Sequence, residues 1–407
     1  MKRADGNWVD GDRFNDREHE RRALRTLLEE GSHVLIVAPR RVGKTSLMRQ
    51  TARELGSGWT CLHVDLQGCK TPADAIVELS LATRPIQSAW SRTQDIFRNA
   101  LASVDAVEVD ALTVKLRDGV GADWQARGTR LLQELARLDG NVVIFMDELP
   151  ILVNRMLGPG APPAPEGVAA ADALISWLRK MSIEHRGRVR LVVAGSIGLG
   201  PVLHRAGLSA TLNTLTPLSL DPWSPEVAIG CLSALSSTYQ LRIQPEALAQ
   251  LSALLGACIP HHVQMFFAQL HDDSQRRRDA MVRLEDVDRV YQTRMLTSRT
   301  HSELLHLEER LALVLGPNLV PLAVDLLTEA AVMGALGAEA AGRLSADLLP
   351  VGDRRHGLIN VLEILVHDGY LRQDGDRYIF LSNLIRDWWK GRFAFGYVPA
   401  ARREVGA

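Results

Sequence analysis

The stretch HVLIVAPRRVGKTSL, residues 33–47, predicts the fold more specifically than any other part of this 407-residue chain. Its beginning, apolar after His33, reads as a buried strand, and the residues from Lys44 onward read as a helix. Between them lie Gly43, Lys44 and Thr45, at the spacing of a phosphate-binding loop, which requires this strand, loop and helix context. The stretch therefore predicts an α/β fold built around a phosphate-binding loop.

The chemistry of this loop follows from its backbone and from two side chains. Successive N–H groups and the positive end of the following helix are expected to surround a β-phosphate, with Lys44 reaching the β and γ oxygens and the Thr45 hydroxyl on Mg²⁺. Ala38 stands where the pattern GxxxxGK(S/T) has its first glycine, so the loop should form unless that position needs a positive φ. The predicted nucleotide-binding residues of the loop are Ala38, Pro39, Arg40, Arg41, Val42, Gly43, Lys44, Thr45 and Ser46.

A second apolar run, NVVIFMDE at residues 141–148, ends in two acidic residues. We expect this strand beside the phosphate-loop strand, with both carboxylates directed at the nucleotide. Asp147 would hold Mg²⁺, mostly through water, and Glu148 would polarise the water that attacks the γ-phosphorus. An ordinary solvated strand end is the competing interpretation. The pair predicts hydrolysis as well as binding.

Four short apolar runs alternate with helical stretches in the first half of the chain: HVLIVAP, WTCLHVDL, NVVIFMDEL and RVRLVVAGS. This alternation predicts a parallel sheet that is buried by helices on both faces. A period-two pattern at about 105–118 predicts an inserted strand pair, and the Pro, Gly and Ala-rich stretch 158–167 predicts a loop without regular structure. We assign residues 1–220 to this core.

After Leu220 the strands stop and helical segments follow, three of them with Pro in the first turn. We assign residues 221–300 to a helical lid. The segments begin at Pro225, Pro245, Pro260 and about Glu285.

A further helical series leads to the pattern YLRQ, Asp374-Gly375, DRYIFL, which predicts a hairpin with a two-residue turn. Helices followed by such a hairpin favour a winged-helix domain. Its predicted extent is 301–395, followed by a tail at 396–407.

The composition is that of a globular protein, with 46% apolar and 23% charged residues. A formal charge of −1 provides no global attraction to nucleic acid or anionic lipid. The chain begins without an apolar secretory signal and offers no uninterrupted apolar run of about 20 residues, so we expect a cytoplasmic location and no membrane partner. The cysteines show no CxxC pair and are expected to be structural thiols: Cys61, Cys69, Cys231 and Cys258.

Four segments together resemble one known group of proteins. They are APRRVGKTSL at 38–47, FNDRE at 14–18, VDLQGCKTPADAI at 64–76 and TPLSLDPWS at 216–224. They resemble the prokaryotic ATPases first described mainly from archaea, which belong to the signal-transduction ATPases with numerous domains (STAND) and are allied to the AAA+ class. The resemblance covers about residues 8–300.

This resemblance implies that the nucleotide is ATP or ADP with Mg²⁺, and the chain has no guanine-reading NKxD motif. It also implies an ASCE-type P-loop core with strand order 5-1-4-3-2, a helical lid, and a winged-helix module used as an arm.

The resemblance further implies roles for individual residues. Ser196, at the end of RVRLVVAGS, falls at the sensor-one position, which contacts the γ-phosphate or the attacking water. Arg205 falls where AAA+ relatives present an arginine finger to a neighbouring subunit. A common strand-end serine and a surface arginine are the competing interpretations.

Two other sites are implied on either side of the nucleotide. The segment Leu255–His261 resembles a sensor-two element with longer spacing than usual, which makes Pro260 and His261 candidates for nucleotide contact. Arg17, with Glu18, resembles an N-terminal box that packs beside the adenine. A solvent-facing helix start and a capped surface helix are the plain alternatives.

Three functions remain open at this point. The first is an ATP-hydrolysing switch whose winged helix serves protein interaction or self-assembly on ATP. The second is a DNA-binding ATPase of the origin-recognition or transposition-regulator kind, although the expected recognition helix, Gly357–Asp368, is apolar and acidic, and residues 351–407 hold only nine Lys and Arg against seven Asp and Glu. The third is a non-catalytic nucleotide-holding scaffold.

Overall fold

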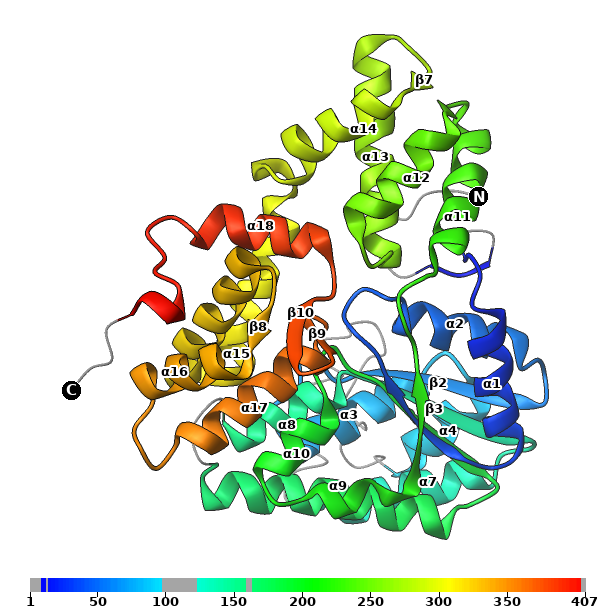
Figure 1. Cartoon of the computed structure of the whole chain (residues 1–407). Helices are drawn as coiled ribbons and strands as arrows, with labels where there is room; N and C mark the ends of the chain where they lie inside the picture. Colours follow the sequence, from blue (N-terminus) through cyan, green and yellow to red (C-terminus); the bar gives the residue numbers. More distant parts are fainter. Residues whose placement is uncertain (1–8, 12–13, 97–122, 159–162, 404–407) are drawn as a thin grey trace.

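The structure is a computed structural model, and it describes residues 9–11, 14–96, 123–158 and 163–403. The strand pair expected at about 105–118 lies outside the described residues. Figure 1 shows a sheet with helices on both faces, a helical region that stands above it and a C-terminal region at its side.

The central sheet has five strands, and every neighbouring pair in it is parallel. Their order is β2-β3-β4-β1-β5, which is the predicted order 5-1-4-3-2 read from the opposite edge. The strands are β1 (His33–Val37), β2 (Trp59–Asp65), β3 (Asn141–Asp147), β4 (Val189–Val193) and β5 (Leu215–Ser219).

Alternate side chains of each central strand enter two different apolar clusters. On β3, Val143 and Phe145 pack with α1 (Glu18–Glu29) and α2 (Lys44–Glu54) on one face. Val142, Ile144 and Met146 face the other cluster, because successive strand residues point to opposite sides. The helices of that second face are α3 (Pro72–Ala82), α4 (Gln87–Ile96), α7 (Trp124–Ala136), α8 (Leu149–Leu157), α9 (Pro165–Glu184) and α10 (Leu199–Arg205).

The start of α9 corrects one sequence-based prediction. The stretch 158–167 was expected to lack regular structure, yet α9 begins at Pro165. Proline is tolerated in a first helical turn, because its missing N–H would have no partner there. The 3-10 helix η3 (Ser209–Thr214) then leads from α10 towards β5.

The helical region, Pro225–Met295, is built around an apolar cluster that also takes in Trp223 and, from the C-terminal region, Leu384. Three of its helices begin at the predicted prolines, and the fourth begins at Leu284, one residue before the predicted start. Its elements are α11 (Pro225–Tyr239), α12 (Pro245–Leu255), α13 (Pro260–Arg277), α14 (Leu284–Val290), the π-helix η4 (Tyr291–Met295) and the strand pair β6 (Arg242–Ile243) and β7 (Met281–Val282).

The C-terminal region, Ser298–Arg402, is built of helices around a three-stranded sheet with the order β8-β10-β9. The predicted hairpin is present, but its turn is Gly375-Asp376, one residue later than expected, since Gly375 takes the positive φ of 62° that a tight turn needs. The elements are α15 (Ser298–Met333), β8 (Leu336–Gly337), α16 (Ala338–Leu348), α17 (Arg354–His367), β9 (Leu371–Asp374), β10 (Arg377–Phe380), α18 (Asn383–Phe393) and the 3-10 helix η5 (Ala400–Arg402).

Part of α15, Leu304–Met333, is long and apolar enough by composition to cross a membrane, and 56% of its most apolar window is buried inside the protein. The helix is interrupted at Gly316, whose φ of 68° and ψ of 176° are not helical, and Pro317 follows. Its apolar side chains pack against α16, α17 and α18. It therefore serves as the core helix of the C-terminal region.

The C-terminal region shares an apolar cluster with the core. Leu307 and Leu311 of α15 belong to the same buried cluster as Leu152 and Leu199 beneath the sheet. The Asn154 side-chain amide also donates to the Leu313 carbonyl at 3.1 Å. The C-terminal region is thus packed directly onto one layer of the core.

Candidate functional site

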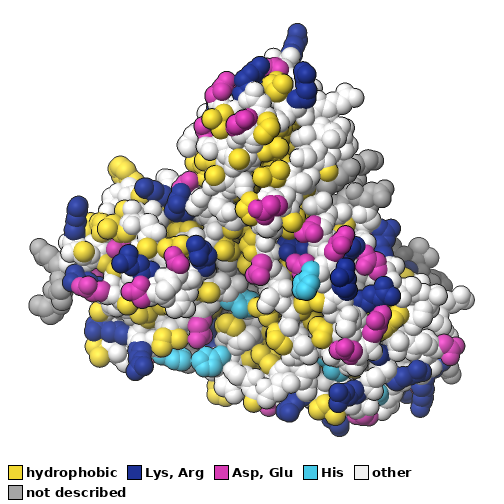
Figure 2. Space-filling model, turned by 45° about the vertical axis from the view of Figure 1, so that its right-hand side comes forward, with side chains coloured by type: hydrophobic (Ala, Val, Ile, Leu, Met, Phe, Trp, Pro, Cys, Tyr) yellow, Lys and Arg dark blue, Asp and Glu magenta, His cyan; other side chains and the backbone are white. Residues whose placement is uncertain are grey.

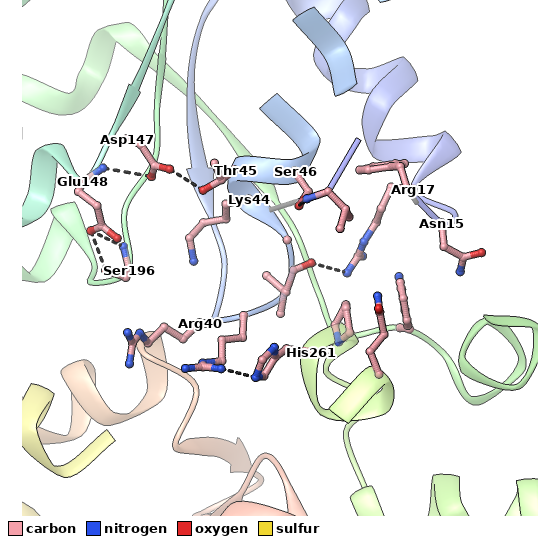
Figure 3. A pocket seen from close by; sticks show the side chains of 18 residues that line it. Asn15, Arg17, Arg40, Lys44, Thr45, Ser46, Asp147, Glu148, Ser196 and His261 are labelled. Atoms are coloured by element: carbon pink, nitrogen blue, oxygen red, sulfur yellow. Dashed lines mark hydrogen bonds between the residues drawn. The ribbon is translucent and has the colours of Figure 1, made fainter. Parts of the chain in front are cut away.

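A cavity of about 410 Å³ opens at the carboxyl end of β1 and β3, between the core and the helical region (Figure 3). Ligands of open parallel sheets bind at this end of the strands. The lining residues are Val9, Phe14, Asn15, Arg17, Arg40, Arg41, Val42, Gly43, Lys44, Thr45, Ser46, Asp147, Glu148, Ser196, Trp223, Pro260, His261 and Gln264.

The loop between β1 and α2 has the backbone of an anion-binding turn. Gly43, at φ 100°, precedes the first turn of α2, and Arg41 also takes a positive φ of 63°. Ala38 is 4% exposed and is not among the residues with positive φ, so the missing glycine imposes no strain at that position. The N–H groups of this helix start are available for a phosphate.

Lys44 is held inside the loop. Its Nζ donates to the carbonyls of Ala38 at 3.0 Å and Pro39 at 2.8 Å. Burial lowers the pKa of its ammonium group to about 8, against the opposing effect of nearby carboxylates. A lysine desolvated in this way gains from an anionic ligand, because phosphate oxygens would compensate its charge.

The predicted metal ligands lie side by side. The Thr45 hydroxyl donates to Oδ2 of Asp147 at 2.5 Å. Burial raises the pKa of the Asp147 carboxyl, and the hydrogen bond from Thr45 opposes that shift. Within the described residues no cluster of three or more His, Cys, Asp or Glu could hold a metal. One hydroxyl and one carboxylate, with phosphate oxygens and water, fit Mg²⁺, which rarely uses a full protein cage.

Glu148 is oriented by the end of β4. Its backbone takes a left-handed φ of 61° just before α8. Its Oε2 accepts from the Ser196 N–H at 3.0 Å and from the Ser196 hydroxyl at 2.6 Å, as the dashed lines of Figure 3 show. The structure thus brings the predicted catalytic carboxylate and the predicted sensor-one serine into direct contact.

The helical region and the N-terminal segment close the other side of the cavity. Arg17 is 6% exposed and donates to the Val42 carbonyl at 3.2 Å and the Asp221 carbonyl at 2.7 Å, so it ties the phosphate loop to the strand exit after β5. His261, next to Pro260 at the start of α13, contacts the Arg41 guanidinium through its Nε2. Arg17, Pro260 and His261 therefore line the same cavity as the phosphate loop, and their contact with a nucleotide stays a prediction.

Two predicted residues lie away from the cavity. Glu18 is exposed on the first turn of α1. Arg205 donates from Nη2 to Oδ1 of Asn154 at 3.0 Å and to the Gly158 carbonyl at 2.9 Å, contacts that fix the end of α8. Its role towards a neighbouring subunit stays a prediction.

Sequence reasoning missed several residues of the site. Phe14, Asn15 and Trp223 lie in segments that carried the resemblance, although none of them was assigned to the site. Arg40 and Arg41, both among the predicted loop residues, line the cavity as well. Arg310 of α15 donates to the Ser196 hydroxyl, and no local pattern around it pointed to the site.

The cysteines are all within the described part of the chain and none forms a disulfide. Three are buried and Cys61 is partly buried. Burial raises the pKa of the Cys61 thiol to about 11 and that of Cys231 to about 12. Such thiols are inert, in agreement with a structural role.

Comparisons with known proteins bear on the fold. No family model and no curated protein matches the sequence. Among solved structures, the Walker-type ATPase paby2304 of Pyrococcus abyssi is similar, with a TM-score of 0.63 and 16% identity over 95% of this chain and 99% of that one. The ORC2 protein of Aeropyrum pernix, solved as ADPNP-ADP complexes, has a TM-score of 0.55 and 12% identity over 96% and 98% of the two chains. With the sheet order, these likenesses show that the chain has the fold of P-loop NTPases.

Proposed function

We propose that this protein binds ATP with Mg²⁺ and hydrolyses it slowly, as a molecular switch of the STAND and AAA+ type. The observation that carries the proposal is the convergence of Lys44, the Thr45–Asp147 pair and the Ser196–Glu148 pair on one cavity. Each pair joins residues that are distant in the sequence. A lone phosphate-loop motif would not supply this set.

The assigned roles follow from the contacts. Lys44 and the helix start bind the β- and γ-phosphates, and Thr45 with Asp147 holds Mg²⁺. The metal would supply charge neutralisation at the phosphates. Glu148 polarises the attacking water, and Ser196 keeps its carboxylate in place. A complete set of this kind favours turnover over a non-catalytic scaffold.

The adenine end of the nucleotide is assigned to the N-terminal segment and the helical region. Phe14, Asn15, Arg17, Trp223 and His261 all line the cavity. Aromatic and amide side chains of this kind suit a purine ring, which has an apolar face and polar edges. This arrangement supports ATP or ADP as the ligand.

The switch would act on the two outer parts of the chain. We interpret residues 1–220 as the ATPase core, 221–300 as its lid, 301–395 as a winged-helix arm and 396–407 as a tail. Lid and arm are joined, since the Tyr291 hydroxyl donates to Asp387 of α18 at 2.8 Å and the Ser382 hydroxyl donates to the Leu255 carbonyl at 3.3 Å. Closure of the lid on ATP would therefore act on the arm through these contacts and change the surface that the arm offers to a protein partner.

A protein partner or self-assembly fits the arm better than DNA does. Val361, Ile364 and Leu365 of the expected recognition helix α17 are buried, so one face of that helix packs inside the protein. Arg276 and Arg277, in the densest basic run, pair with Asp272 and Asp273 of their own helix. In the view of Figure 2, Lys and Arg side chains are interspersed with Asp and Glu. Phosphate-backbone binding requires concentrated positive charge instead.

The experiment is a joint measurement of ATP hydrolysis and molecular mass, with and without ATP and duplex DNA. We expect turnover by the wild-type protein, none by Lys44→Ala, and an increase in mass on ATP if Arg205 acts on a neighbouring subunit. Bound ADP without turnover would favour the scaffold function. Salt-sensitive retention of DNA would favour the DNA-binding ATPase.

A further inference from the structure

A cation from the C-terminal region reaches the back of the candidate site. Arg310 projects from α15, and its Nη2 donates to the Ser196 hydroxyl. The same nitrogen lies 3.9 Å from Oε2 of Glu148. The Arg310 side chain is only 10% exposed. A guanidinium from outside the core thus touches the serine that orients the proposed catalytic carboxylate.

Glu148 compensates the charge of Arg310 at ion-pair distance but accepts none of its N–H groups. A separation of 3.9 Å is too long for a hydrogen bond to Glu148, and the Arg310 Nε is buried without a hydrogen-bond partner among the described residues. Nη1 of neighbouring Arg40 is buried without a partner as well. Buried polar atoms are normally satisfied, and an uncompensated buried charge is costly. The two guanidinium groups therefore indicate a missing acceptor.

The local charge identifies the missing acceptor as an anion. Arg40 and Lys44 line the cavity, and Arg310 lies behind its lining at Ser196, so three positive charges gather here. Burial together with the charge of Arg310 lowers the pKa of Arg40. Against them stand Asp147, Glu148 and the buried Asp368, of which Asp147 is assigned to the metal. A bound divalent cation would turn this balance into a positive excess. A polyphosphate is the ligand whose charge balances such a site.

The position of Arg310 selects one phosphate of that ligand. The loop backbone surrounds the β-phosphate, so the terminal phosphate of a triphosphate extends beyond the loop towards the Glu148–Ser196 pair. Arg310 lies at this pair and not along the loop. A diphosphate would end before reaching it.

We propose that Arg310 binds the terminal phosphate of ATP, so that the C-terminal region distinguishes ATP from ADP through this one side chain. The inference rests on the proposed function and adds to it the residue that distinguishes ATP from ADP by binding the terminal phosphate. When the terminal phosphate leaves, Arg310 loses its acceptor, and the contact between the C-terminal region and the site weakens.

The base of Arg310 is rigidly supported, which suits a phosphate-binding residue. The Leu307 carbonyl, one turn earlier on α15, accepts a hydrogen bond of 2.7 Å from the buried Tyr370 hydroxyl. Gly369 lies against the phosphate loop, since a Cβ added there would meet Cβ of Pro39 at 2.6 Å. The helix that carries Arg310 is therefore fixed relative to the loop that holds the β-phosphate.

The test compares affinities for ADP and for a non-hydrolysable ATP analogue, both with Mg²⁺, by calorimetry on the full chain. Arg310→Ala should weaken analogue binding about ten- to a hundredfold, as expected for the loss of a charge-assisted hydrogen bond, and leave ADP binding unchanged. Arg310→Lys should recover part of the loss because it keeps the charge. Arg343→Ala is the matched control, since Arg343 is an exposed arginine of the same region paired with Glu339 at 2.7 Å.

Retained ADP binding also shows that the Arg310 variant is folded. An equal loss of ADP and analogue binding would overturn the inference and make Arg310 a structural support of the site. Unchanged affinities with faster turnover would also overturn it, because Arg310 would then restrain Glu148. If the wild-type protein binds neither nucleotide, the proposed function itself fails and the inference fails with it.

Discussion

The helical region and the C-terminal region meet the core in different ways. The helical region has an apolar cluster of its own, adds Ile259 to the buried cluster of the core, and reaches the phosphate loop through polar contacts such as His261 with Arg41. The C-terminal region continues the apolar cluster of the core and brings Arg310 against Ser196. Apolar continuity makes two parts unfold and move together, and polar contacts permit rotation. The comparison suggests a mobile lid and an arm coupled closely to the site.

The largest expected effect comes from a matched pair of Leu→Ala substitutions, each of which creates a cavity in one of the two regions. Leu311 of α15 and Leu251 of α12 are both buried, and each Leu→Ala change should destabilise its surroundings by about 2–5 kcal/mol. Leu311→Ala should lower the unfolding temperature of the core, and Leu251→Ala that of a separate, smaller transition. Scanning calorimetry of both variants checks this. One common transition that shifts equally in both would show that the two regions do not differ.

A second effect concerns the contact between the C-terminal region and the phosphate loop. Gly369 and Gly334 have nearly the same φ, 82° and 84°, but only at Gly369 would a Cβ meet the loop, at 2.6 Å from Pro39. Both Gly→Ala changes share a backbone cost of about 1–2 kcal/mol. Gly369→Ala should cost about 1–3 kcal/mol more through overpacking and should weaken nucleotide binding.

Thermal melts and nucleotide titrations of the two glycine variants separate these contributions. Since Gly334 has open space around its Cα, its alanine variant reports the backbone cost alone. Equal melting temperatures and equal nucleotide affinities for the two variants would show that the contact between Gly369 and the phosphate loop affects neither stability nor binding.

The smallest effect is on the pH dependence of nucleotide binding. Burial lowers the pKa of Lys44 to about 8, and nearby carboxylates, Asp368 of the C-terminal region among them, oppose that shift. Because phosphates favour the charged ammonium, affinity should fall above pH 8, by up to about tenfold per pH unit. Asp368→Asn removes a charge that favours the ammonium, so the fall should begin at lower pH.

His261→Ala is the comparison for this effect in the helical region, and it should leave the midpoint of the pH dependence in place. Calorimetric titrations with ADP across a pH series measure both variants against the wild type. If His261→Ala shifted the midpoint of the pH dependence and Asp368→Asn did not, the helical region and not the C-terminal region would influence the pKa of Lys44.

Local patterns predicted the centre of the site and the arrangement of the sheet. The phosphate loop, the acidic end of β3 and the strand order were predicted from a motif, from apolar runs and from the resemblance. The structure confirms the strand order and places Thr45 and Asp147 in contact, while their role as metal ligands stays a prediction. Ala38 can replace the first glycine of the motif because its backbone does not take a positive φ. The sequence alone could not show this.

The other features of the fold and site could not be predicted from local patterns, because they depend on contacts between distant parts of the chain. Arg310 is separated from Ser196 by 114 positions, and no spacing rule links a residue of one helix to a strand end of another region. The turn at Gly375-Asp376 was placed one residue early, because either Asp-Gly or Gly-Asp suits a two-residue turn and the strand register decides between them. The Pro-rich composition of 158–167 predicted a loop, although one of its prolines, Pro165, begins a helix.

The central claim is that Glu148, held by Ser196, activates water for ATP hydrolysis in the site built around Lys44. The most direct measurement is steady-state ATP turnover, together with ATP affinity, for the wild-type protein and Glu148→Gln, which keeps the shape of the side chain and removes its charge. The account predicts that turnover falls about 10²- to 10⁴-fold while ATP binding is retained. Unchanged turnover in Glu148→Gln would contradict it.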